Sequence, residues 1–143
     1  MKSVLKAVGR PTTTGIPSYS ETMPCKPESA RRARLLVTAA LSTWGIEELV
    51  DAAKLVVDEL LTNAIDHTRC RTARIAIRRI ADDRVRISVA DTSRDVPDMS
   101  NPRQDSEDGR GLVLVDALSD QWGYDRHRTW KVVWAELRTG ASR

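Results

Sequence analysis

Two stretches of the chain repeat apolar residues at helical spacing, and each predicts a helix that buries one face. The first runs from Pro27 to Trp44 and is followed by Gly45, a residue that commonly ends a helix. The second runs from about Glu47 to His67. The apolar stripes form the expected core: Ala30, Ala33, Leu36, Val37, Ala40, Leu41 and Trp44, then Val50, Ala53, Val57, Leu60, Leu61 and Ala64.

The period then changes from helical spacing to alternation, which predicts strands at residues 73–80 and 84–91 joined by a turn at 81–83. Residues 92–110 are rich in Ser, Asp, Pro and Gly and suit a mobile binding loop. A helix from Leu112 to Leu118 and strands near 121–125 and 129–138 follow, with residues 130–134 mainly in the core. The order predicts an α/β (α+β) sandwich with helices on one face of a mixed or antiparallel sheet.

The first 26 residues have a different character. Residues 1–26 combine prolines and threonines with little periodicity, so we expect a flexible N-terminal arm with room for one short strand. The arm's basic residues Lys2, Lys6 and Arg10 could contact nucleic acid, although a solvated tail is the favoured interpretation. The predicted organisation is an arm at 1–26, one folded domain at 27–139 and a tail at 140–143.

Composition narrows the classes of function. The 143 residues suit one domain, and 41% hydrophobic with 30% charged residues is typical of a globular protein. The net charge of +3 comes from 23 basic and 20 acidic residues spread along the chain, so nucleic acid is not an expected partner. Cys25 and Cys70 are too few and too isolated for a zinc site or a disulfide scaffold, which predicts reduced thiols. No apolar run approaches the roughly 20 residues of a membrane helix, and we expect a cytoplasmic protein.

The second helix carries a polar row. Glu59, Asn63 and His67 are four residues apart, so they follow one side of the helix, about 100° from the core stripe and facing away from the sheet. Asn and Glu offer the hard oxygen atoms that suit Mg²⁺ and phosphate chemistry. Considered alone, a solvated helix face is the better supported alternative.

Three further features could bind a ligand, and each has a structural alternative. Asp91 ends its strand on the core side, where an unpaired carboxylate costs several kcal/mol; an adenine amine or the amides of an Asx-turn would serve as its donor. The Gly-Arg-Gly-Leu segment at 109–112 precedes a helix and could approach phosphate closely, or form a plain loop. Lys131 could reach a phosphate, or be a solvated strand lysine.

The order of these segments resembles the Bergerat-fold (GHKL) ATPases, the superfamily of gyrase, histidine kinases and mismatch-repair ATPases. Residues 59–67, Glu-Leu-Leu-Thr-Asn-Ala-Ile-Asp-His, resemble its N box. Asp91 with Ser93 and Pro97 resembles the adenine-binding motif, and residues 109–112 resemble the phosphate lid. Residues 133–137 are similar to the closing strand of the anti-sigma serine kinase branch. The resemblance covers roughly residues 27–138.

The resemblance implies roles for the matching positions. Asn63 would be the Mg²⁺ ligand, Glu59 the catalytic base, Asp91 the adenine anchor and Arg110 a γ-phosphate contact; His67 gains no firm role. Ser93 stands where the superfamily usually has glycine, as in a version common in the short anti-sigma-like proteins of actinobacteria. Together with Lys131, the candidate nucleotide-binding residues are Asn63, Asp91, Ser93, Gly109, Arg110, Gly111 and Leu112.

The implied function is an ATP-binding serine/threonine-protein kinase that uses Mg²⁺ and acts as an anti-sigma factor in bacterial transcription regulation. Its partners would be a sigma factor and a STAS-type anti-anti-sigma antagonist, and members of the branch often form homodimers. The absence of a phospho-acceptor hairpin and of a transducer domain favours this branch. The first alternative is a non-catalytic ATP-binding module that binds a protein partner. The second is a basic protein that uses its arm on nucleic acid.

Overall fold

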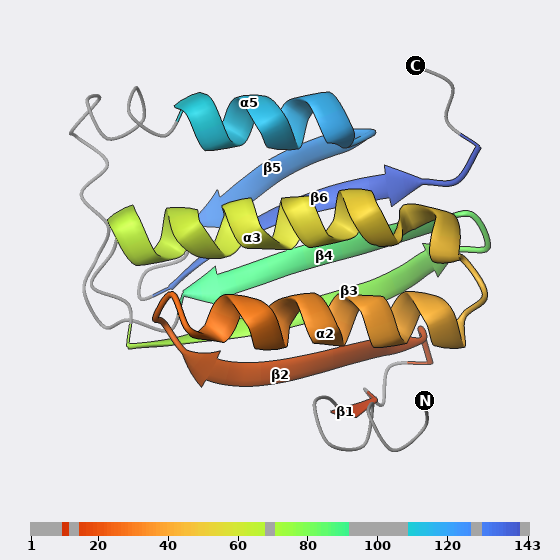
Figure 1. Cartoon of the computed structure of the whole chain (residues 1–143), viewed down its shortest axis with the longest axis horizontal. Coiled ribbons are helices and arrows are strands. Elements are labelled where there is room, and N and C mark those ends of the chain that lie inside the picture. The colour runs from red at the N-terminus through yellow and green to blue at the C-terminus, as the bar shows by residue number, and fades with distance from the viewer. Residues whose placement is uncertain (1–9, 12–14, 68–70, 92–108, 127–129, 141–143) are drawn as a thin grey trace.

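The computed structural model describes residues 10–11, 15–67, 71–91, 109–126 and 130–140. Helices and strands alternate in blocks along the chain (Figure 1). In chain order they are β1 (Arg10–Pro11), β2 (Ser18–Pro24), α2 (Ser29–Thr43), the 3-10 helix η1 (Glu47–Leu49), α3 (Val50–His67), β3 (Thr72–Ala81), β4 (Arg84–Asp91), α5 (Gly109–Leu118), β5 (Gln121–Arg126) and β6 (Lys131–Arg138).

The strands form one sheet in the order β1-β2-β3-β4-β6-β5, and every described pair is antiparallel. The β3–β4 hairpin and its turn lie where the alternating pattern predicts them, with Ile77 opposite Ile87. β6 lies between β4 and β5, so the last two strands occur in the sheet in the reverse of their order in the sequence. The predicted α+β sandwich is confirmed, with an antiparallel sheet.

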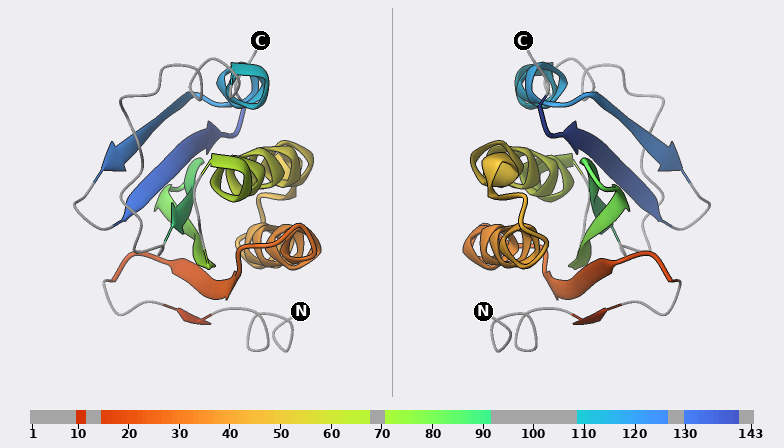
Figure 2. Two further views of the ribbon diagram at one scale, coloured as in Figure 1. Left: turned by 90° about the vertical axis from the view of Figure 1, so that its left-hand side faces the viewer. Right: turned by 90° about the vertical axis from the view of Figure 1, so that its right-hand side faces the viewer.

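The helices cover one face of this sheet, as the two side views show (Figure 2). α2 and α3 pack against each other, and α3 also packs against β4 and α5. An ion pair of 2.9 Å between Arg34 and Asp58 joins α2 to α3 at the surface. The core lies between this helical layer and the sheet. Its largest fully buried side chains include Leu36, Leu41, Leu60, Leu61, Ile75, Ile77, Ile87 and Leu137.

Two leucines of α3 differ sharply in burial and provide a matched test of the core. Leu60 is fully buried, whereas Leu55 is 47% exposed. We expect Leu60→Ala to lower the free energy of unfolding by about 2–5 kcal/mol, because it removes buried methyl groups and leaves a cavity. Leu55→Ala should change it by less than about 0.5 kcal/mol. Urea unfolding of both variants measures the difference, and equal losses would contradict the packing described.

The N-terminal prediction needs correction. Residues 18–24 form β2, which pairs with β3 along its whole length, and the Met23 side chain is 2% exposed. The one short strand that the sequence allows in the arm is therefore present, whereas the flexible character expected for residues 1–26 does not hold for this segment, because it pairs with β3 along its length. Cys25 is also different from expectation: it is disulfide-bonded, and Cys70, the other cysteine of the sequence, lies outside the described residues.

Two further expectations about the second half of the chain are wrong. α5 begins at Gly109, three residues before the predicted start. The tryptophans at 130 and 134 are not core residues: Trp130 is 40% exposed, and Trp134 alternates with the buried Val133 and Ala135 and so lies on the side away from the helices. None of the described helices is both long and apolar enough to span a membrane.

Candidate functional site

Apart from Lys131 of β6, the predicted site residues that the structure describes come from three elements whose ends lie together at one end of the fold. The C-terminal end of α3, the end of β4 and the beginning of α5 all lie at the left of Figure 1. α3 packs on both of the other elements, which fixes these ends relative to one another. Segments far apart in the sequence, near residues 63, 91 and 109, therefore border one region.

Glu59 and Asn63 lie on the side of α3 that faces α5. Ala52 of α3 lines a hollow together with Ala117 and Leu118 of α5, so the Ala52 side faces α5. Glu59 and Asn63 follow Ala52 by seven and eleven residues, which returns each to within about 20° of the same direction. Both side chains are half-buried, off the fully buried stripe as predicted. The side chain of His67 lies outside the described ones.

Asp91 ends β4 with its side chain among the helix-facing positions. It is 4% exposed, on the parity of the buried Val85, Ile87 and Val89, as the alternation predicts. Lys131 of β6 is its direct cross-strand neighbour, and the Lys131 ammonium lies 5.5 Å from the centre of the Tyr124 ring on β5. Asp91 makes its own contacts within the fold. The sequence did not single out Tyr124, because its place beside Lys131 depends on the β5–β6 register.

The Gly-Arg-Gly-Leu segment forms the first turn of α5 instead of the loop before it. Residues 109–112 open the helix. The amides of the first turn have no acceptor within a helix, and the helix dipole favours an anion beside them. The helix starts earlier than predicted, but the backbone amides of residues 109–112 still suit phosphate binding, as the sequence predicts. Ser93, Pro97 and the rest of the predicted loop at 92–108 lie outside the described residues.

α5 is anchored at its far end. The Trp122 indole N–H donates to the Asp116 carboxylate at 2.9 Å, and the backbone N–H of Asp120 donates to the carbonyl oxygen of Glu136 at 2.8 Å. The hollow that Ala52 borders, about 320 Å³ in volume, lies at this same end and so away from Asn63 and Asp91. These contacts tie the C-terminal end of α5, which is opposite its glycine-containing end.

The donor atoms at the site suit magnesium nucleotide binding. Mg²⁺ prefers hard oxygen ligands and usually keeps several waters or phosphate oxygens. The amide oxygen of Asn63 and the carboxylate of Glu59 are such donors. Within the described ranges, no group of three or more His, Cys, Asp and Glu residues is placed to hold a metal ion. A magnesium ion at Asn63 would complete its shell with phosphate oxygens and water.

Comparison with known proteins gives the family and the fold of the chain. The fold is similar to the crystal structure of the RsbU and RsbW domains of Rv1364c from Mycobacterium tuberculosis, with a TM-score of 0.58 and 19% sequence identity. That match covers 85% of this chain and 32% of the other, so the chain spans about a third of the protein it resembles. The comparison with curated proteins gave no match. The model of the histidine kinase-like ATPase domain matches residues 23–137, and the chain belongs to this family.

Proposed function

We propose that this chain is an ATP-dependent serine/threonine kinase that acts as an anti-sigma factor. The observation that carries the proposal is the meeting of three elements at one end of the fold: the half-buried Glu59 and Asn63 on α3, the buried Asp91 on β4 and the first turn of α5. The similarity to a structure that contains an RsbW domain supports the anti-sigma branch. The partners would be a sigma factor and a STAS-type antagonist.

Each residue has a part in the proposed reaction. Asp91 accepts a hydrogen bond from the adenine amine, and the first-turn amides of α5 with Arg110 hold the phosphates. Asn63 would hold Mg²⁺, which supplies charge neutralisation on the phosphates. Glu59 accepts the proton of the attacking serine or threonine hydroxyl of the antagonist as the oxygen attacks the γ-phosphorus. The bond to the β-phosphate oxygen breaks, and ADP leaves.

A transfer assay tests the kinase against the alternative of a non-catalytic ATP-binding module. The protein is incubated with γ-labelled ATP, Mg²⁺ and candidate STAS-type antagonists, and the label is located by mass spectrometry. The kinase predicts a phosphoserine or phosphothreonine on an antagonist. A protein that binds ATP but labels none of the antagonists it binds would support the module instead.

Asp91 is expected to select adenine over guanine. Its carboxylate can accept from the adenine amine, whereas guanine presents a carbonyl oxygen at that position. A lost pairing at a buried polar group costs about 1–3 kcal/mol, enough for a preference of the order of a hundredfold. Titration with ATP and GTP measures the preference, and Asp91→Asn should reduce it. Asp125→Asn, at an exposed position of β5, is the control. Equal affinity of the wild-type protein for both nucleotides would assign Asp91 a purely structural role.

A further inference from the structure

The sheet has a second face that no described helix covers (Figure 2). Val85, Ile87 and Val89 of β4 are buried under the helices, so the alternate positions point to the other side. The β-sheet register places the corresponding positions of β3 and β6 beside them. We call this the open face. Its residues on the three central strands are Arg74, Ala76, Arg78, Arg84, Arg86, Ser88, Ala90, Val132, Trp134, Glu136 and Arg138.

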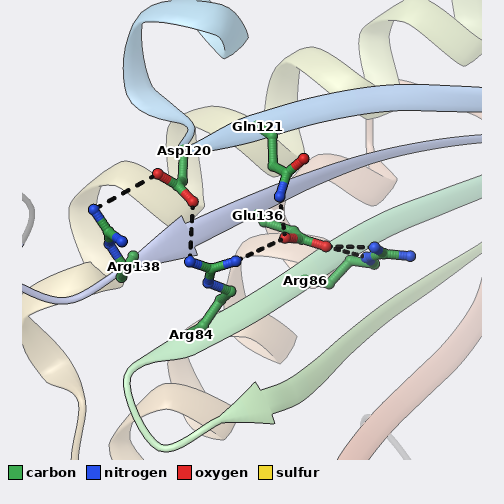
Figure 3. A network of polar contacts seen from close by, with 6 residues as sticks. All are labelled: Arg84, Arg86, Asp120, Gln121, Glu136 and Arg138. Carbon is green, nitrogen blue, oxygen red and sulfur yellow. Dashed lines mark hydrogen bonds and ion pairs between the residues drawn. The ribbon is translucent and has the colours of Figure 1, made fainter.

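Two pairs of arginines lie directly opposite each other on the open face. Arg84 pairs with Arg138 across β4 and β6, and like charges at such positions are destabilising. The Asp120 carboxylate lies between them, 3.3 Å from Arg84 and 3.9 Å from Arg138 (Figure 3). The fold therefore supplies a carboxylate to this pair.

The second pair, Arg78 and Arg86, has one arginine with a carboxylate and one without. Arg86 Nε donates to Glu136 at 2.8 Å. Glu136 has a side chain only 3% exposed and also lies 3.6 Å from Arg84, so its oxygens are already engaged (Figure 3). Among the described residues, no carboxylate contacts Arg78.

Arg74, four residues earlier on β3, is a second arginine of the open face whose described side-chain partner is not a carboxylate. Its guanidinium donates to the Ser20 hydroxyl at 3.2 Å, and within the described part of the chain it contacts no carboxylate. Four residues of strand separate Arg74 and Arg78 by about 13 Å, and both side chains point the same way. The cross-strand neighbour of Arg74 on β4 is the small Ala90, and the small Ala76 lies between the two arginines on β3.

Trp134, the aromatic residue of the open face, already has an arginine stacked on its ring. The Arg86 guanidinium lies 4.3 Å from the centre of the Trp134 ring. Gly123 makes room for this ring, because a Cβ atom there would lie 2.9 Å from Trp134 Cζ2. Proteins that bind single-stranded nucleic acid combine a continuous positive groove with free aromatic faces. The open face instead interleaves carboxylates with its arginines, which favours a polypeptide partner.

We propose that the open face is a docking surface for an acidic protein segment whose carboxylates pair with Arg74 and Arg78. A second copy of this chain does not fit, since it would present the same arginines. A carboxylate of the segment would pair with Arg78, as the Asp120 carboxylate pairs with Arg84 and Arg138. This surface lies on the opposite side of the sheet from the helices, so its binding does not depend on the kinase function proposed above.

Fluorescence anisotropy with a labelled poly-glutamate peptide tests the surface. Arg74→Gln/Arg78→Gln should weaken binding roughly tenfold, a loss of about 1.4 kcal/mol, since each exposed ion pair is individually weak. The control Arg31→Gln/Lys54→Gln removes the same charge from the helices on the other face and should change binding less than about twofold. Arg74→Lys/Arg78→Lys keeps the charge and should retain most of the affinity. Thermal unfolding checks that each variant is folded.

Three outcomes would overturn the proposal. The wild-type protein could fail to bind poly-glutamate at low salt. The glutamine double variant and its control could lose affinity equally, which would indicate binding through net charge alone. Finally, oligothymidylate could bind more tightly than poly-glutamate and depend on the same two arginines, which would make the open face a nucleic-acid platform.

Discussion

Glu59→Gln is expected to lower phosphotransfer to an antagonist by a factor of about a hundred or more while leaving Mg-ATP binding nearly unchanged. Removing a general base typically costs two to four orders of magnitude in rate. Glu59 lies one helical turn before Asn63 on the side of α3 that faces α5, so it can reach a hydroxyl near the γ-phosphate without holding the nucleotide. Single-turnover transfer at equal ATP occupancy measures the effect.

The control for this variant is Asp51→Asn, which removes one carboxylate from an exposed position in the first turn of the same helix. It should transfer phosphate at the wild-type rate. If Glu59→Gln also transfers at that rate, another group accepts the proton. If Glu59→Gln loses ATP binding together with transfer, the residue belongs to the nucleotide site and not to the chemistry.

Asn63→Ala is expected to weaken Mg-ATP binding by a factor of the order of a hundred without unfolding the protein. A metal ion beside the phosphates contributes several kcal/mol of electrostatic stabilisation, and a loss of about 2.7 kcal/mol of this with the Asn63 ligand corresponds to that factor. The Asn63 side chain is half-buried and off the core stripe, so the free energy of unfolding should change by less than about 1 kcal/mol.

The neighbouring Thr62 provides the control for Asn63, because it is exposed on the same turn of α3. Thr62→Ala should bind Mg-ATP like the wild-type protein. A second comparison uses ATP without Mg²⁺, for which Asn63→Ala and wild type should differ little. An Asn63→Ala protein that is folded and binds Mg-ATP normally would contradict the metal site at this residue.

The sequence predicted the elements with strong periodicity well. The stripes from Ala33 to Leu41 and from Ala53 to Ala64 gave two helices within a few residues of their bounds, because each buries one regular face. Alternation from Val85 to Val89 gave β4 and the buried position of Asp91. These features depend on local spacing alone.

The elements that the sequence missed depend on pairing between distant segments. β2 has a mostly polar sequence in which Ser18 and Met23 are the buried positions, and it becomes a strand because β3 offers a partner edge. The sequence predicts the start of α5 three residues too late, because the glycines at 109 and 111 are typical of loops. The sequence also predicts Trp134 in the core. Its true side of the sheet depends on the β4–β6 register, which local spacing does not show.

The candidate site likewise combines features that local spacing predicts with features that depend on packing and register. Spacing identified Glu59 and Asn63 as a row outside the core stripe, whereas their direction toward α5 follows from how the two helices pack. The cross-strand neighbourhood of Asp91 and Lys131 likewise follows from register. The arginines of the open face gave no signal in a net charge of +3, since five of them gather only when three strands align.

We propose that this chain binds Mg-ATP between the C-terminal end of α3, the end of β4 and the first turn of α5. Calorimetric titration of the folded protein with ATP in the presence of Mg²⁺ tests it most directly. We expect saturable binding of one nucleotide per chain, with GTP binding far more weakly. A folded protein that gives no saturable heat with Mg-ATP would contradict the claim and leave the fold as a partner-binding domain.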